Sequence, residues 1–265
     1  MTKIYHYTSL DTLLYILKYK TLRFTSLGQV DDLYESKTSD YGFLAEYCYV
    51  SCWTKIQEES IPQWSMYSRD MTGIRIGIEF DSVDDVFDLI EYKFDDKEDK
   101  ISSSLIPEKM EIMGSNPPYK PIYKEVIYTD DESFLIPNVY SRYEYDEKNY
   151  EERVDYTQIG IFKPTAWDFQ KETRFNVMLT PWTIKDHLEI LDRGDMKAHL
   201  KMMSRAREEK PLLSHIDIKL NESIFEKLSV LTAPKCSDAQ KEMLQMILDK
   251  YAPNVKYTES ILQIQ

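Results

Sequence analysis

Short stretches of alternating apolar and polar residues recur along the chain, and this period of two is typical of strands with one buried face. The most informative stretch is residues 163–179 (KPTAWDFQKETRFNVML), which ends in such an alternation after a proline-led turn. Gln170 and Glu172 stand two residues apart where this strand begins, so their side chains are expected on the same face. The pattern therefore predicts an amide and a carboxylate side by side, with a solvated strand end as the ordinary alternative.

The same patterns of apolar and polar residues, together with capping residues, predict the other elements. Strands are expected at residues 3–8, 22–26, 47–54, 74–80, 119–128, 215–220, 227–232 and 255–264. Helices are expected after a cap at Thr8 or Ser9 as far as about Lys20, from Ser60 to Gly73, over residues 185–209 with a break near Gly194, and from Ser237 to about Tyr251. Residues 139–156 are predicted as a charged, tyrosine-rich helical segment and residues 81–99 as partly helical, while Asp31 or Asp32 is expected to cap a helix after the acidic loop 29–35.

The chain has the length and composition of a folded protein. Its 265 residues are 42% hydrophobic and 13% aromatic, which excludes a disordered chain despite 30% charged residues. No internal repeat or flexible linker interrupts it, so we expect a single elaborated domain over residues 1–265. A weak change of composition near Thr183 leaves open a C-terminal subregion over residues 184–265.

Charge and residue usage exclude several classes of function. A net charge of −13 opposes nonspecific capture by nucleic acid or anionic lipid. The three cysteines and four histidines show no disulfide framework and no metal-binding spacing, so no metal site is expected. No apolar run reaches the roughly 20 residues of a membrane span, and no cleavable signal is recognisable. A cytoplasmic protein without membrane contact is expected, and glycine-rich dinucleotide or phosphate loops are absent.

Three aromatic or titratable residues stand out beside Gln170 and Glu172. His6 lies near the end of the first strand, and Trp64 and Tyr67 are three apart on one helix face. Structural roles are the alternative for each: a hydrogen-bonded histidine at a strand end, and core packing for the two aromatic residues.

The motifs, taken in order, resemble the bacterial family known as domain of unknown function 2971. They are YHYTSLDTLLYILKYKTLRFTS, QVDDLYE, SCWT with QWSMYS and GIRIGIEF, KPTAWDFQKETRF, and LTAPKCSDAQ with ESILQI. The resemblance spans nearly the whole chain. Three positions depart from the family pattern: Asp31 and Leu33 stand where that family has Asn and Pro in its acidic loop, and Gln170 stands where it often has Glu.

This motif order in turn resembles the His-Tyr-Glu branch of the ADP-ribosyltransferase superfamily. The resemblance implies an α+β fold in which helices pack around a split, mixed or antiparallel sheet. It implies NAD as substrate, Glu172 as the residue that stabilises an oxocarbenium-like ribose, and Gln170 as the residue that positions the acceptor. It assigns contacts with NAD to His6, Thr8, Ser51, Trp64 and Tyr67. On this interpretation Glu172→Ala lowers turnover by several powers of ten and leaves the fold intact.

The implied function is a bacterial toxin or antiphage effector that modifies an unidentified protein or nucleic acid and that an antitoxin partner would restrain. A catalytically inactive nucleotide- or partner-binding module of the same fold is the first alternative. A nuclease is the second, and it would need clustered carboxylates where the chain offers dispersed ones such as Glu79, Asp81 and Asp84.

Overall fold

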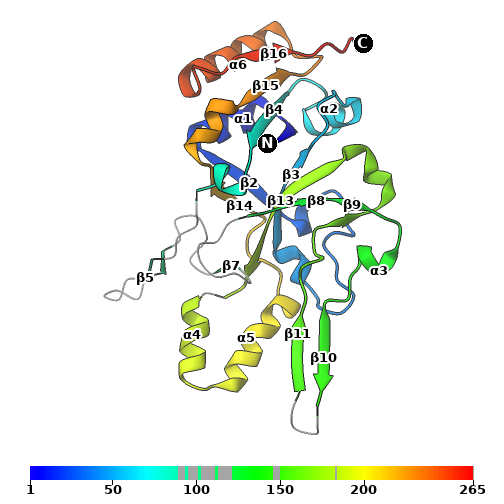
Figure 1. Ribbon diagram of the computed structural model, residues 1–265, viewed down its shortest axis with the longest axis vertical. Helices are drawn as coiled ribbons and strands as arrows, with labels where there is room; N and C mark the ends of the chain where they lie inside the picture. The colour runs from blue at the N-terminus through cyan, green and yellow to red at the C-terminus, as the bar shows by residue number, and fades with distance from the viewer. Residues whose placement is uncertain are drawn as a thin grey trace.

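The computed structural model describes residues 1–88, 93–94, 101–102, 111–112, 121–145, 150–182 and 184–264. Its elements form an α+β fold with one large mixed sheet and several helices (Figure 1). Figure 1 also shows α4, α5 and the β10–β11 hairpin extending from the end of the molecule opposite α6.

The large sheet has the strand order β14-β2-β3-β1-β4-β15-β16, and β13 pairs with the second edge of β3. Its strands are β1 (Thr2–Thr8), β2 (Thr21–Ser26), β3 (Cys48–Thr54), β4 (Ile74–Phe80), β7 (Glu111–Ile112), β8 (Ile122–Glu125), β13 (Glu172–Thr180), β14 (His215–Lys219), β15 (Ser229–Thr232) and β16 (Tyr257–Glu259). β15 and β16 pair in parallel, and the other neighbours pair antiparallel. The remaining strands are β5 (Lys93–Phe94), β6 (Ile101–Ser102), β9 (Ile127–Tyr128), β10 (Tyr140–Glu144), β11 (Tyr150–Val154) and β12 (Phe162–Lys163).

The sheet divides at β3. One edge of β3 pairs with β13 along its whole length, from Met178 opposite Cys48 to Glu172 opposite Thr54. On the other edge, β2 pairs with residues 49–50 and β1 pairs with Thr54, so β1 and β2 diverge from each other. The split between these two strands is the feature that positions the site described below.

Helices cover and connect the strands. They are α1 (Leu10–Tyr19), α2 (Ile61–Tyr67), α3 (Glu132–Leu135), α4 (Ile184–Asp192), α5 (Met196–Glu208) and α6 (Asp238–Tyr251), with 3-10 turns η1 (Leu27–Gln29), η2 (Leu44–Tyr47), η3 (Val83–Asp85), η4 (Thr165–Gln170) and η5 (Glu222–Lys227). Ser9 caps α1 through the backbone N–H of Thr12, and Ser237 and Gln240 form a reciprocal capping box on α6. The larger hydrophobic cluster takes buried side chains from Ile4 to Val255, and a smaller one contains Tyr7, Trp64, Met71 and Ala233.

Phe175 on β13 lies at the centre of the larger cluster. Its fully buried ring lies 4.9 Å from the ring of Phe87, 5.4 Å from that of Tyr123 and 5.8 Å from that of Phe80, measured between centroids. Aromatic rings at these separations and angles stabilise a core beyond simple area burial. β13 is therefore anchored in the core directly after the residues that line the site.

Most predicted strands and helices are confirmed, and four predictions are wrong. Within residues 139–156, Tyr140–Glu144 and Tyr150–Val154 pair as the antiparallel strands β10 and β11, and tyrosines contact charged residues across the pair, as Tyr140 does by donating to Glu152 at 2.8 Å. Tyrosine favours strands, and the charged residues that suggested a helix form the exposed cross-strand partners instead. No helix follows the acidic loop; Asp32 accepts a hydrogen bond from the backbone of Tyr34 in a local turn.

The other two errors concern where elements end. α2 ends at Tyr67 rather than Gly73, because Arg69, Asp70 and Met71 adopt left-handed backbone conformations. The last strand covers only Tyr257–Glu259. Within residues 81–99 the structure has the short turn η3, and residues 89–92 and 95–99 lie outside the described part of the chain, as do 119 and 120 of the predicted strand 119–128.

Candidate functional site

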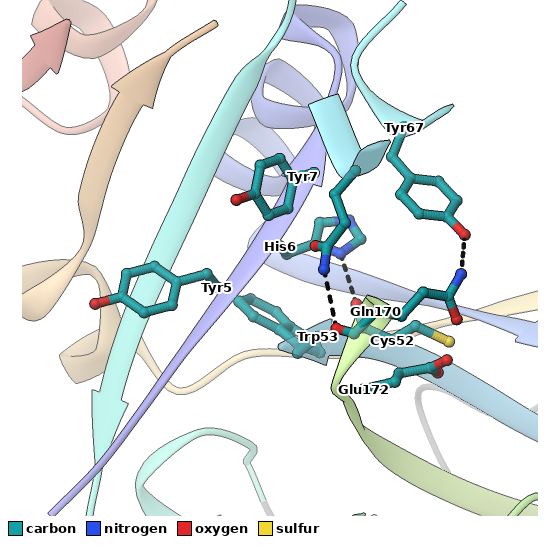
Figure 2. Close-up of a pocket in the computed structure, with 9 residues that line it drawn as sticks. Tyr5, His6, Tyr7, Cys52, Trp53, Tyr67, Gln170 and Glu172 are labelled. Atoms are coloured by element: carbon teal, nitrogen blue, oxygen red, sulfur yellow. Dashed lines mark hydrogen bonds between the residues drawn. The ribbon is translucent and has the colours of Figure 1, made fainter. Parts of the chain in front are cut away.

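A pocket opens at the split in the sheet, beside the end of β1. It is lined by Tyr5, His6, Tyr7, Cys52, Trp53, Gln63, Tyr67, Gln170 and Glu172 (Figure 2). Four side chains predicted from the sequence thus meet in one place: His6 from β1, Tyr67 from α2, Gln170 from η4 and Glu172 from β13. The cavity has a volume of about 80 Å³, smaller than the ~300–1,000 Å³ typical of ligand pockets. A ligand larger than a single ring therefore needs the lining to move.

His6 is held by a hydrogen bond to the backbone of β3 beside the split. Its Nδ1 donates a hydrogen bond to the carbonyl of Cys52 at 2.7 Å, and its ring lies 5.2 Å from that of Trp53. Burial lowers the pKa of His6, and the bond to the Cys52 carbonyl offsets only part of this effect. The imidazole is therefore neutral at pH 7, with Nε2 as a hydrogen-bond acceptor.

Gln170 is placed by a turn rather than by the strand. It is the last residue of η4, and Lys171 follows in a left-handed conformation with φ of 42°. The side chain of Gln63 donates to the Gln170 carbonyl at 2.9 Å, and the Gln170 amide donates to the Tyr67 hydroxyl at 2.5 Å. The prediction that Gln170 and Glu172 share a strand face is wrong in its geometry, because the pair meets through the turn.

Glu172 belongs to a buried group of four charges. One carboxylate oxygen lies 2.9 Å from Nε and 2.6 Å from Nη2 of Arg174, and the other lies 3.0 Å from Nζ of Lys163. Arg174 also donates to Glu35 at 2.6 Å, and Lys163 donates to the Gln170 side-chain oxygen at 2.8 Å. Two cations and two anions balance, as a buried cluster requires.

The protonation states follow from this cluster. Burial opposes ionisation of Glu172, but Arg174 and Lys163 outweigh it and hold the pKa of Glu172 below its usual value. Burial likewise opposes the charge on Lys163, but Glu172 and Glu35 outweigh it and raise the pKa of that lysine. Burial, with the negative charge of Asp31, raises the pKa of Tyr67, so the phenol stays protonated. At neutral pH the pocket thus presents a carboxylate, a neutral phenol and a neutral imidazole.

Cys52 is the thiol nearest to these groups. Burial raises the pKa of Cys52 well above its ordinary value, and the charge of Glu172 adds to this effect. A thiol needs a lowered pKa to act as a nucleophile near pH 7. The pocket therefore does not present an activated cysteine.

Three residues assigned to NAD contact lie outside the pocket lining. Thr8 ends β1 opposite Ile74. The hydroxyl of Ser51 accepts a hydrogen bond from the Trp53 indole at 3.1 Å. Trp64 is fully buried, with its ring edge-on to Tyr7 and its indole N–H donating to Glu59 at 3.0 Å. Their positions give them packing and hydrogen-bonding roles in the described structure.

Sequence reasoning missed several residues of the site. Gln63 is four residues before Tyr67 on α2, so helical spacing could have placed it on the same face. Tyr5 and Tyr7 flank His6 on β1 and carried no signal beyond their alternation. Lys163 opens the stretch that contains Gln170 and Glu172, but only the folded chain brings its ammonium to them.

Arg174 forms buried salt bridges with both Glu35 and Glu172. Their ion pairs also argue against the expectation that Glu172→Ala leaves the fold intact. Removing one member of a buried ion pair leaves the partner charge uncompensated, which costs about 3–5 kcal/mol.

Two broader features of the described residues bear on the chemistry. Among them, no group of three or more His, Cys, Asp and Glu side chains is arranged to hold a metal ion. None of the helices described is both long enough and apolar enough to cross a membrane.

Comparison with known proteins adds one finding. No curated protein and no solved structure matches the chain. One family model matches residues 63–175, a part of the chain that carries most of α2, all of η4 and the start of β13, and so includes Tyr67, Lys163, Gln170 and Glu172 but not His6. Residues 63–175 match the family model described as "Protein of unknown function (DUF2971)", which confirms the predicted resemblance over that part of the chain.

Proposed function

We propose that the protein is an NAD-dependent ADP-ribosyltransferase that acts in the cytoplasm as a bacterial toxin or antiphage effector. The observation that carries this proposal is the meeting of His6, Tyr67, Gln170 and Glu172 in one pocket, although they come from three separate parts of the chain. The split of the large sheet at β3 is a second support, because the resemblance implies a split sheet.

The reaction breaks the bond between the nicotinamide nitrogen and C1′ of the ribose. The electron pair leaves with nicotinamide, and the sugar passes through an oxocarbenium-like state before an acceptor attacks C1′ and loses its proton. Glu172 accepts a hydrogen bond from the ribose 2′-hydroxyl and stabilises the cationic sugar, an interaction that strengthens in the transition state. Gln170 positions the acceptor.

The other two residues bind the cofactor. Tyr67 offers a neutral ring for stacking against nicotinamide. His6 uses Nδ1 for the Cys52 carbonyl, so its free Nε2 accepts a hydrogen bond from a ribose hydroxyl. Both roles agree with the protonation states that burial imposes.

Binding requires two local changes. The cavity of about 80 Å³ must widen, and the hydrogen bond between Gln170 and Tyr67 closes one side of it. A ribose hydroxyl reaches Glu172 by displacing the Lys163 ammonium, which keeps the Gln170 side-chain oxygen as a partner at 2.8 Å. The carboxylate then retains Arg174 and stays ionised.

A catalytically inactive nucleotide- or partner-binding module is the second candidate. The observation that favours it is the pairing of both Glu172 oxygens with cations, which weakens the negative charge available to an oxocarbenium-like sugar. In this case the pocket would bind NAD without cleaving it.

Two measurements on the purified protein separate the candidates. NAD labelled in the nicotinamide ring reports bond cleavage, and NAD labelled in the adenine, incubated with cell lysate, reports transfer and identifies the acceptor fraction. Nicotinamide release together with labelled acceptor supports the transferase. Saturable NAD binding by calorimetry without nicotinamide release supports the inactive module, and the absence of both binding and release rejects the transferase and an NAD-binding module alike.

A further inference from the structure

A second cavity lies between α1 and the β2–β14 pair and shares His6 with the first pocket. Its volume is about 250 Å³, roughly three times that of the first pocket. The shared histidine makes the two cavities neighbours at the split between β1 and β2. None of the roles assigned above uses the second cavity.

Two exposed tyrosines form one wall of this cavity. Tyr15 and Tyr19 lie one turn apart on α1, 58% and 55% exposed, with ring centroids 6.0 Å apart and planes within 15°. Behind them, Ile16 and Leu22 are buried and provide an apolar floor. Exposed parallel rings beside an apolar floor suit a flat aromatic ligand, since base–aromatic stacking contributes about 1–3 kcal/mol per base.

A fork of hydrogen-bond donors lies in the same lining. Arg23 on β2 and Asp217 on β14 stand directly opposite each other. The guanidinium donates from Nε to one Asp217 oxygen at 2.9 Å and from Nη2 to the other at 3.1 Å. This pairing fixes the plane of the guanidinium and leaves its remaining N–H groups for other acceptors.

An arginine held in this way selects a ligand edge with two adjacent acceptors. In nucleic-acid recognition, the commonest specific contact of this kind joins arginine to O6 and N7 of guanine. Adenine offers N7 beside an amino donor, which an arginine fork does not match. The tyrosine wall and the arginine fork therefore suit a purine, and of the purines guanine fits better.

We propose that this second cavity binds a purine nucleoside and prefers guanosine to adenosine. The base stacks on the tyrosine wall of α1, and its O6 and N7 accept hydrogen bonds from Arg23. Asp217 acts as a positioning residue, because it touches Arg23 and sets the direction of the fork. The site goes beyond the proposed transfer reaction and does not depend on it.

Nucleoside binding to the full-length protein tests the proposal without any turnover assay. Guanosine, adenosine and cytidine are titrated separately and followed by saturation-transfer NMR and calorimetry. We expect saturable guanosine binding that is about tenfold tighter than adenosine binding. Arg23→Lys keeps the positive charge but loses the pair of parallel donors, so it should abolish the preference for guanosine. Tyr19→Ala should weaken the binding of both guanosine and adenosine.

Tyr143→Ala is the matched control, since Tyr143 is 53% exposed on β10 and does not line this cavity. It should leave nucleoside binding unchanged. Absence of saturable binding, equal binding of all three nucleosides, or a guanosine preference that survives Arg23→Lys overturns the proposal. Nicotinamide release measured separately distinguishes this failure from a failure of the proposed transferase activity.

Discussion

His6 combines two roles at the residue scale. Its imidazole satisfies the carbonyl of Cys52 where β1 leaves β3, and it borders both cavities. A buried carbonyl without a partner would cost stability, so the histidine stabilises the split that forms the site. A structural hydrogen bond at the strand end and a contact with NAD are therefore compatible roles for His6.

The lowered pKa of His6 predicts a pH dependence of stability. Its pKa in the folded protein lies below the ordinary value of 6.5, because burial disfavours the charged ring. The unfolded chain therefore takes up the proton first, so the free energy of unfolding falls as the pH drops below 6.5 and through the folded pKa. His6→Gln should reduce this slope in urea denaturation measured between pH 5 and 7.5.

His187→Gln is the control, because burial, with the nearby His199, also lowers the pKa of the less buried His187. It should remove a smaller part of the slope. A wild-type stability that does not change between pH 7.5 and 5, or a His6 variant with an unchanged slope, would contradict the assignment of His6 as a neutral ring in the folded protein.

Residue identities in the site were only partly predictable. Four residues occupy recognisable positions in the family motifs, and the structure brings them together in one pocket: His6, Tyr67, Gln170 and Glu172. Lys163 had no comparable signal, because a lysine on a strand is ordinary until folding surrounds it with carboxylates. Trp64 lies three residues before Tyr67, which suggested that it also faces the pocket, but its ring packs in the core against Tyr7.

The turn at Lys171 decides the geometry at the element scale. The left-handed backbone conformation costs residues other than glycine about 1–2 kcal/mol. Here it ends η4 and starts β13, so it sets the angle between Gln170 and Glu172. The conformation is strained at a position where the site depends on it.

A pair of substitutions isolates this strain. Lys171→Gly should change the free energy of unfolding by less than about 1 kcal/mol, because glycine tolerates the conformation but is more flexible when unfolded. Lys171→Val should lower it by about 1–2 kcal/mol, because a β-branched side chain is poorly accommodated there. Both variants lose the half-exposed ion pair with Asp168, so urea denaturation of the two reports the backbone alone. Equal stability of the two variants would contradict a left-handed Lys171.

Elements with local signals were the predictable ones. The start of α6 after Ser237 and the alternation in β4 depend only on nearby residues, and both elements were predicted. The β10–β11 hairpin was mistaken for a helix because its stability comes from cross-strand pairs. Such pairs cannot be read from spacing along one segment.

At the scale of the whole molecule, one aromatic core supports both sides of the split sheet. Phe175 contacts Phe80 of β4 and Trp53 of β3, with ring centroids 5.8 Å and 6.4 Å away. The strand order that brings these rings together was not predictable, because it depends on pairing between distant segments. The α+β class, by contrast, was implied by the family resemblance, and the structure has it.

Phe175→Ala should therefore lower the stability of the whole protein. We expect the free energy of unfolding to fall by about 3–5 kcal/mol, because the substitution leaves a cavity among packed rings. Phe134→Ala serves as the control, since Phe134 is 42% exposed, and it should have a much smaller effect. Thermal unfolding by circular dichroism measures both, and similar losses for the two variants would contradict a core centred on β13.

The most direct test of the proposed function compares nicotinamide release from NAD by Glu172→Gln and Glu35→Gln. Each variant removes one negative charge from the same buried cluster, so each should lose about 3–5 kcal/mol of stability. Only Glu172 lines the pocket, and measurements are made where circular dichroism shows both variants folded. We predict that Glu172→Gln reduces release at least about a hundredfold and that Glu35→Gln stays near the wild-type rate. Equal rates for the two variants would contradict a role for Glu172 in stabilising the reacting ribose.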